Sequence, residues 1–152
     1  MSFIIISSSL NPDSKSRILA KKAQEYFKEN VEFINLQDYN LPIYDGASAY
    51  GNEDVIKITE KLSKAKGYLI STPVYNYDAN SAIKNLIELT GKDIWTGKVV
   101  GFMCAAGGNS SYMSIMGIAN SLMLDFRTFI IPRFVYATEE QIVPDINSDV
   151  QE

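Results

Sequence analysis

The sequence predicts an α/β fold, a doubly wound five-stranded parallel sheet with helices on both faces. Three observations support this fold class. Short apolar or alternating segments recur along the chain, amphipathic segments separate them, and turn-forming residues mark most junctions. The expected strands are residues 3–6, 31–36, 67–72, 98–105 and 127–132. Because parallel neighbours must be joined by a crossover, this alternation of strand and helix favours a parallel sheet.

Helical periodicity is clearest where apolar residues recur every three or four positions. The segments with that spacing are residues 14–30, 54–64, 80–90 and 112–124. Asn52 is a suitable cap for the second of these helices, and Gly91 is a suitable stop for the third. We expect residues beyond 132 to form a polar loop or tail.

Strands connected in this way fit the flavodoxin-like strand order 2-1-3-4-5. We expect the third strand to end at Pro73, because proline cannot donate to a sheet ladder. The chain shows no internal repeat, low-complexity tract or linker. We therefore expect residues 1–152 to form a single domain.

Composition excludes several function classes. A net charge of -4 argues against nucleic acid or an acidic membrane surface as a partner. The chain has no histidine and one cysteine, Cys104, so zinc sites and Ser-His or Cys-His nucleophiles are not expected. A lone cysteine, no signal peptide and no long apolar stretch favour a cytoplasmic location without a membrane partner.

Ligands of doubly wound sheets bind beyond the carboxyl ends of the strands, near the point where strand order reverses. That rule selects three segments here, residues 7–16, 73–80 and 105–111. All three have unusual compositions, being rich in serine, tyrosine with asparagine, and glycine respectively. Their shared position is the strongest argument in the sequence for a binding site.

The first segment, SSSLNPDSKS, is rich in hydroxyl groups. Ser9, Ser14 and Ser16, with the amide of Asn11, can donate to phosphate oxygens at the start of a helix. Asp13 should point into solvent, because a carboxylate would repel a phosphate. Neither the nucleoside-triphosphate motif nor the dinucleotide motif is present. A polar turn with a helix cap explains the same residues without any ligand.

The second segment follows the third strand with Pro73 and Val74. Tyr75 and Tyr77 flank Asn76, an arrangement suited to a planar ring with a polar edge. The alternative is that the tyrosines pack on a neighbouring helix and Asn76 forms a turn.

The third segment, AAGGNSS, follows the fourth strand. Ala106, Gly107 and Gly108 allow a close approach of backbone amides, and Asn109 can start the next helix. Such amides can stabilise negative charge on a reduced ring. A glycine turn with a helix cap is the simpler interpretation, and Cys104 is best explained as a small core residue.

Together these residues make residues 3–133 resemble the NADPH-dependent FMN reductase family, whose markers match SSSLNPDSKSR, TPVYNYDANSAIKN and AAGGNSS. The resemblance implies an FMN phosphate at the first loop and the flavin ring at the other two. The residues that it assigns to the cofactor are Ser9, Asn11, Ser14, Ser16, Pro73, Val74, Tyr75, Asn76, Tyr77, Ala106, Gly107, Gly108 and Asn109. It assigns no catalytic side chain, because the flavin performs the chemistry.

Two features depart from the family pattern. The first loop has Asn11 where the family commonly has arginine, so one charged phosphate contact is missing. The chain also lacks an obvious final amphipathic helix, which leaves part of the last strand to be covered by another subunit. The resemblance implies a homodimer or homotetramer, because members of the family usually form such assemblies.

The leading hypothesis is an FMN-dependent NAD(P)H oxidoreductase that reduces a small acceptor such as a quinone, an azo compound, a metal oxyanion or free flavin. One alternative is a non-enzymatic flavodoxin-like electron carrier, although such carriers have a strongly acidic face and a different phosphate loop. Another is an interaction domain that uses the same fold without a cofactor.

Overall fold

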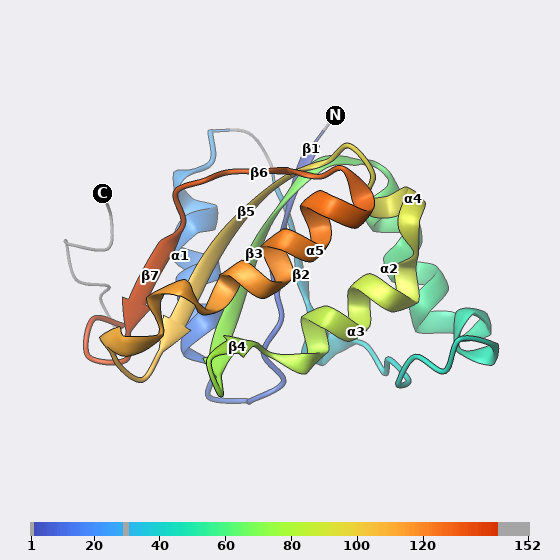
Figure 1. Ribbon diagram of the computed structural model, residues 1–152. Helices are drawn as coiled ribbons and strands as arrows, with labels where there is room; N and C mark the ends of the chain where they lie inside the picture. The colour runs from blue at the N-terminus through green and yellow to red at the C-terminus, as the bar shows by residue number, and fades with distance from the viewer. Residues whose placement is uncertain (1, 29–30, 143–152) are drawn as a thin grey trace.

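The computed structural model describes residues 2–28 and 31–142. Its sheet has the order β2-β1-β3-β5-β6, which confirms the predicted flavodoxin-like arrangement (Figure 1). These strands are parallel and comprise β2 (Glu32–Asn35), β1 (Ser2–Ser7), β3 (Ala65–Tyr75), β5 (Val99–Ala106) and β6 (Phe129–Ile130). The reversal of strand order therefore falls between β1 and β3, as the predicted site requires.

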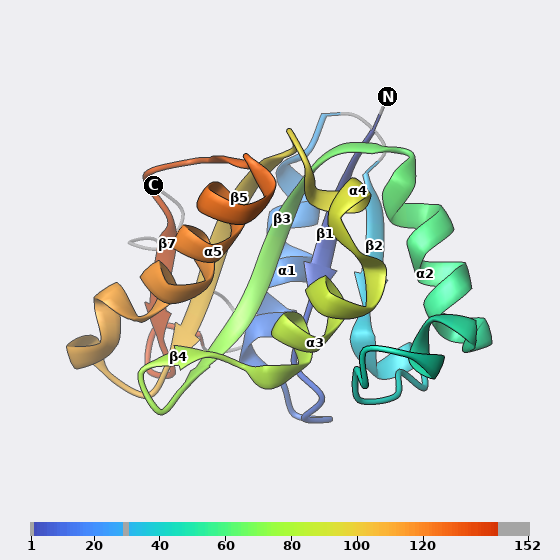
Figure 2. The same cartoon turned by 45° about the vertical axis from the view of Figure 1, so that its right-hand side comes forward.

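Helices cover the two faces of the sheet unequally (Figure 2). One face carries α1 (Lys15–Tyr26), which packs with Ile5 and Met103 of the strands. The helices on the other side are α2 (Glu53–Ser63), α3 (Ser81–Thr90), α4 (Lys92–Trp95) and α5 (Met116–Phe126). The larger core cluster lies on that side and includes Tyr68 and Trp95.

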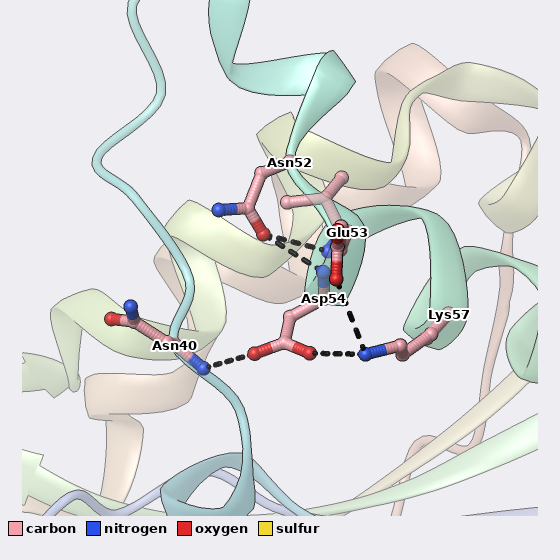
Figure 3. Close-up of polar contacts among 6 residues, drawn as sticks. Asn40, Asn52, Glu53, Asp54 and Lys57 are labelled. Carbon is pink, nitrogen blue, oxygen red and sulfur yellow. Dashed lines mark hydrogen bonds and ion pairs between the residues drawn. The ribbon is translucent and has the colours of Figure 1, made fainter.

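The start of α2 shows how a polar cap fixes a helix end (Figure 3). Asn52 Oδ1 accepts hydrogen bonds from the amides of Asp54 (2.9 Å) and Val55 (3.2 Å), which confirms the predicted cap. The Asp54 carboxylate accepts from the amide of Asn40 and lies 3.3 Å from Lys57 Nζ. Chiefly through the Asn40 amide, these contacts lower the pKa of Asp54.

Two predictions about strand ends were wrong. The strand β3 continues through Pro73 to Tyr75 and turns back into β4 (Asp78–Ala79), with which it pairs antiparallel. The amide of Ser8 bonds the carbonyl of Ser71, so the backbone of Pro73, two residues on, faces the same side. Because β1 has ended at Ser7, the missing N–H of Pro73 breaks no ladder bond there.

The last predicted strand, residues 127–132, also has the wrong bounds, because β6 covers only Phe129–Ile130. Beyond the short β6, the chain forms β7 (Val135–Thr138), which pairs with Met103 to Ala106 of β5. The expected polar loop after 132 is therefore partly a strand, and β6 and β7 together line one edge. None of the helices in the described ranges is long and apolar enough to cross a bilayer.

Candidate functional site

The three loops singled out from the sequence meet at the carboxyl edge of the sheet, at the bottom of Figures 1 and 2. A pocket of ≈ 150 Å³ lies between them. Its predicted lining residues are Ser9, Asn11, Ser14, Ser16, Pro73, Val74, Tyr75 and Gly107, joined by Asp13, Lys15, Ala105 and Glu139. The sheet therefore brings together residues more than a hundred positions apart.

The serines of the first loop both build the loop and line the pocket. Ser14 Oγ accepts a hydrogen bond from the amide of Arg17 (3.0 Å) and so caps α1. The same oxygen lies 3.0 Å from Ser16 Oγ, and both serines are buried. Ser9 Oγ accepts from the amide of Asn11 (3.2 Å). The helix-cap interpretation is thus confirmed, and the same hydroxyls also face the pocket.

The electrostatic surroundings of this pocket are mixed. The pocket lies at the start of α1, where helical N–H groups without intrahelical acceptors favour an anion. Lys15 adds a cation to the lining. Asp13 and Glu139 also belong to the lining, so two carboxylates lie at this pocket, and Asp13 is exposed to solvent. The loop places Asp13 there because its amide bonds Asn11 Oδ1 (2.9 Å).

Gln37, which the sequence analysis missed, supports the first loop from the end of β2. Its side-chain amide donates to the carbonyls of Ser9 and Asn11, and its Oε1 accepts from Arg17. Arg17 also donates to the carbonyl of Pro12. The guanidinium of Arg17 therefore holds the loop backbone. No local sequence pattern indicates this, because Gln37 lies in the 3-10 segment Leu36–Asp38 that follows a neighbouring strand.

The second loop is a tight hairpin between β3 and β4. Its two central residues, Asn76 and Tyr77, have positive φ angles of 52° and 64°. Both angles fit a two-residue turn that matches the twist of paired strands. Asparagine tolerates this region of φ, whereas tyrosine rarely adopts it. Neither residue lines the pocket; both are exposed beside it, with Tyr77 57% exposed.

The third loop differs from its prediction in how the next helix begins. Asn109 is exposed and starts a 3-10 segment, Asn109–Ile115, so it does not cap an α-helix. Gly107 lines the pocket and Gly108 lies next to it in the chain. Ala106 is buried within the sheet, where its carbonyl accepts from the amide of Glu139 (2.9 Å), and Ala105 faces the pocket in its place.

Aromatic residues of the unpredicted strand β7 hold this third loop. Tyr136 donates its hydroxyl hydrogen bond to the carbonyl of Gly108. Tyr112 stacks on Phe134 with ring centroids 5.0 Å apart and meets Tyr136 edge-on at 5.5 Å. The run FVYAT at residues 134–138, rich in aromatic and β-branched residues, is the signal that could have revealed the strand, although not its partner.

The remaining chemistry of the site is sparse. Burial raises the pKa of the Cys104 thiol to about 12, as expected of an inert core residue. Among the described residues, no group of three or more His, Cys, Asp or Glu side chains could hold a metal ion. The pocket offers hydroxyls, amides and aromatic rings, a set that binds and orients.

A model of the NADPH-dependent FMN reductase family matches residues 1–141, nearly the whole chain. The chain belongs to this family. The resemblance inferred from the three loops is thereby confirmed, and the loops correspond to the edge at which the family fold places its ligand.

Two relatives illustrate the range of this family. An NAD(P)H-dependent FAD/FMN reductase of Geobacillus thermodenitrificans is 34% identical over 110 residues, 71% of this chain. The match spans only 59% of that reductase's own length. An NADPH azoreductase of a Bacillus species is 26% identical over 80% of this chain and 73% of its own.

Solved structures share the fold at low sequence identity. An NADH:FMN oxidoreductase in its apo form superimposes with a TM-score of 0.80 at 15% identity, covering 99% of this chain and 82% of its own. The NAD(P)H:acceptor oxidoreductase FerB of Paracoccus denitrificans gives a TM-score of 0.73 at 24% identity, covering 88% and 77%. Both confirm the flavodoxin-like FMN reductase architecture.

Proposed function

We propose that this protein is an FMN-dependent NAD(P)H oxidoreductase that passes electrons from a reduced nicotinamide, through bound flavin, to a small acceptor. The observation that supports this most is the hydroxyl-lined pocket at the start of α1, at the strand-order reversal of an FMN reductase family chain. Quinones, azo compounds, metal oxyanions and free flavin are the acceptor classes we consider.

The donor set of the pocket suits the phosphate end of FMN. Buried hydroxyls and helix N–H groups are neutral donors, which bind an anion even in a chain of net charge -4. Its volume of ≈ 150 Å³ suits a phosphate group with its first linker atoms, so the ring would extend past the other loops. We assign the phosphate to Ser9, Asn11, Ser14 and Ser16, and the ring to Pro73, Val74, Tyr75, Asn76, Tyr77, Ala106, Gly107, Gly108 and Asn109.

In this mechanism bound flavin would supply the redox chemistry, and the residues assigned above would hold it. The chain would bind the flavin, orient it and tune its reactivity. The side chain of Ala106 is buried, so this residue would contribute by holding the third loop at the end of β5. Exposed Tyr75 and Tyr77 offer aromatic faces for a planar ring, and the backbone at Gly107 and Gly108 permits close approach to its polar edge. We assign no catalytic acid or base.

We further propose that the protein acts in the cytoplasm as a homodimer or homotetramer formed from a single-domain chain. Exposed apolar side chains support the assembly. Phe129 of β6 is 67% exposed and Leu124 of α5 is 73% exposed, and Tyr112, Met113 and Met123 are also exposed. Ile115, between these residues in the chain, is buried in the core. Sedimentation analysis at micromolar concentration tests the assembly, and a monomer would refute it.

The visible spectrum of the purified protein, alone and after FMN is added, tests the proposed function directly. We expect flavin bands that NADPH or NADH bleaches rapidly under anaerobic conditions and that an acceptor restores. Bound flavin that neither nucleotide bleaches would instead indicate an electron carrier. A protein that takes up no FMN would indicate an interaction domain. Unchanged FMN affinity in both Ser14→Ala and Asn76→Ala would refute the site assignment.

A further inference from the structure

A buried polar network joins the first loop, the end of β3 and the start of α3. Asn80 lies at its centre and is 5% exposed. Although Asn80 immediately precedes α3, its side chain makes no capping hydrogen bond to that helix. It turns toward Ser8 and Thr72 instead. Because the Asn80 side chain makes buried long-range bonds and no cap bond, its role lies outside α3.

Both ends of the Asn80 amide are satisfied. Nδ2 donates to the carbonyl oxygen of Ser8 (2.8 Å), and Oδ1 accepts from Ser8 Oγ (2.8 Å) and Thr72 Oγ1 (3.1 Å). The backbone N–H of Asn80 donates a hydrogen bond to Thr72 Oγ1 (3.3 Å). The opposite orientation of the side chain would set Oδ1 against the Ser8 carbonyl, two acceptors in contact. The network therefore fixes one rotamer and holds Ser8 by both main chain and side chain.

The residues held by Asn80 stand immediately before two opposite walls of the pocket. Ser8 precedes Ser9 in the first loop, and Thr72 precedes Pro73 in the second. Ser9 and Pro73 both line the pocket, whereas Asn80 itself does not. One buried side chain thus ties the first loop to a residue 72 positions away in sequence. The two segments are also joined directly, because Ser8 donates from its amide (3.0 Å) and its Oγ (3.1 Å) to the carbonyl of Ser71, so Asn80 adds a side-chain bridge to this pairing.

We propose that Asn80 is a positioning residue for the cofactor pocket, holding the phosphate wall and the ring wall at the spacing that FMN requires. This inference rests on the proposed function. Its physical basis is preorganisation, because a pocket held in its bound geometry spends less of its binding energy on ordering loops. The competing explanation is that Asn80 only stabilises the fold by satisfying buried polar groups.

Asn85 provides a matched control for that competing explanation. It lies within α3, the helix that Asn80 precedes, and its side chain bridges two backbone groups. Its Nδ2 donates to the carbonyl of Pro42 (2.9 Å), and its Oδ1 accepts from the amide of Tyr44 (2.9 Å). The loop that it holds does not line the ≈ 150 Å³ pocket. Replacing Asn85 by alanine therefore removes similar bonds without touching either wall.

The test measures FMN dissociation constants by fluorescence quenching, with urea unfolding of the apoprotein alongside, for wild type, Asn80→Ala, Ser8→Ala and Asn85→Ala. We expect Asn80→Ala to raise the dissociation constant about tenfold or more, as loss of a buried hydrogen-bond network would. Ser8→Ala should raise it less, because the bond to the Ser8 carbonyl survives. Asn85→Ala should lower stability but leave the FMN constant within about twofold.

Unchanged FMN affinity in Asn80→Ala, or equal losses of affinity in Asn80→Ala and Asn85→Ala, would overturn the inference. If Asn80→Ala does not fold, Ser8→Ala decides, because it removes a single hydroxyl. Unchanged affinity in Ser8→Ala would then count against the inference. A wild-type protein that does not bind FMN would refute the proposed function itself. Normal FMN binding by both wild type and Asn80→Ala would refute only the role of Asn80.

Discussion

The two sides of the pocket are built in different ways. The first loop is tied down by side chains, with Ser14 capping α1 and Gln37 bonding two loop carbonyls. The hairpin of Asn76 and Tyr77 is held by the backbone pairing of β3 with β4, and its tyrosines are exposed. The comparison suggests a division of labour. We expect the rigid side to set how tightly the phosphate is held, and the exposed side to set what can approach the ring.

The largest effect should come from Ser14→Ala, which attacks the rigid side. It removes a pocket hydroxyl and the cap of α1 together, so we expect FMN affinity to fall about tenfold or more and stability to fall by about 1 kcal/mol. Asn52→Ala is the matched control, because Asn52 caps α2 away from the pocket. It should show a similar stability loss in urea with unchanged FMN affinity. Equal FMN losses in both variants would contradict the comparison.

The exposed side should respond differently to Tyr77→Gly. Glycine adopts the observed φ of 64° freely, so we expect stability to rise by roughly 1 kcal/mol as strain is relieved. FMN affinity should change by less than about threefold, whereas KM for a planar acceptor should rise as an aromatic face is lost. Steady-state kinetics with a quinone and urea unfolding check this. A loss of FMN affinity as large as that of Ser14→Ala would refute the division of labour.

Charges on the rigid side give a smaller and salt-dependent effect. We expect Asp13→Asn to tighten FMN binding and Lys15→Ala to weaken it, each by roughly threefold at low salt, because the two groups act oppositely on a phosphate. Both differences should shrink as ionic strength rises. Titrations at low and high salt measure this. Equal shifts of the same sign would show that neither charge faces the phosphate.

The smallest effect on FMN should come from Asp45, which lies in a loop outside the pocket. Hydrogen bonds from Ser48, Ala47 and Ala49 hold the pKa of Asp45 well below 3.8. A lowered folded-state pKa adds stability above the unfolded value, and that contribution is lost as pH falls below about 4. Asp45→Asn should therefore lower stability at pH 7, and its difference from wild type should shrink progressively as pH falls below about 4, leaving FMN affinity at pH 7 unchanged. A constant stability difference across this pH range would contradict the assignment.

The parts of the fold that sequence could predict are those governed by local pattern. Alternation of apolar strands with amphipathic helices was sufficient for the fold class, the strand order followed from that class, and Asn52 was recognisable as a cap. The strand β7 was missed because it follows Pro132 and Arg133 and is only partly buried. Local propensity cannot show that such a segment will find a free edge of β5.

In the candidate site, too, only the features governed by local pattern could be predicted. The three loops were predictable because parallel strands bring their carboxyl ends together. Their supports were not. Gln37, Asn80 and Tyr136 each bond a segment at least 26 positions away, and no residue near them in the sequence announces the partner. Local sequence therefore predicts which residues form a pocket wall. The bonds that hold the wall in place depend on contacts made only in the completed sheet.

The anchoring of Gly108 by Tyr136, together with Glu139 in the pocket lining, has a consequence for biosynthesis. The pocket draws on residues from Ser9 to Glu139, so it closes only after nearly the whole described chain has left the ribosome. FMN can therefore stabilise the finished protein by mass action but cannot template the early strands. Newly made chains must fold first and acquire their cofactor afterwards.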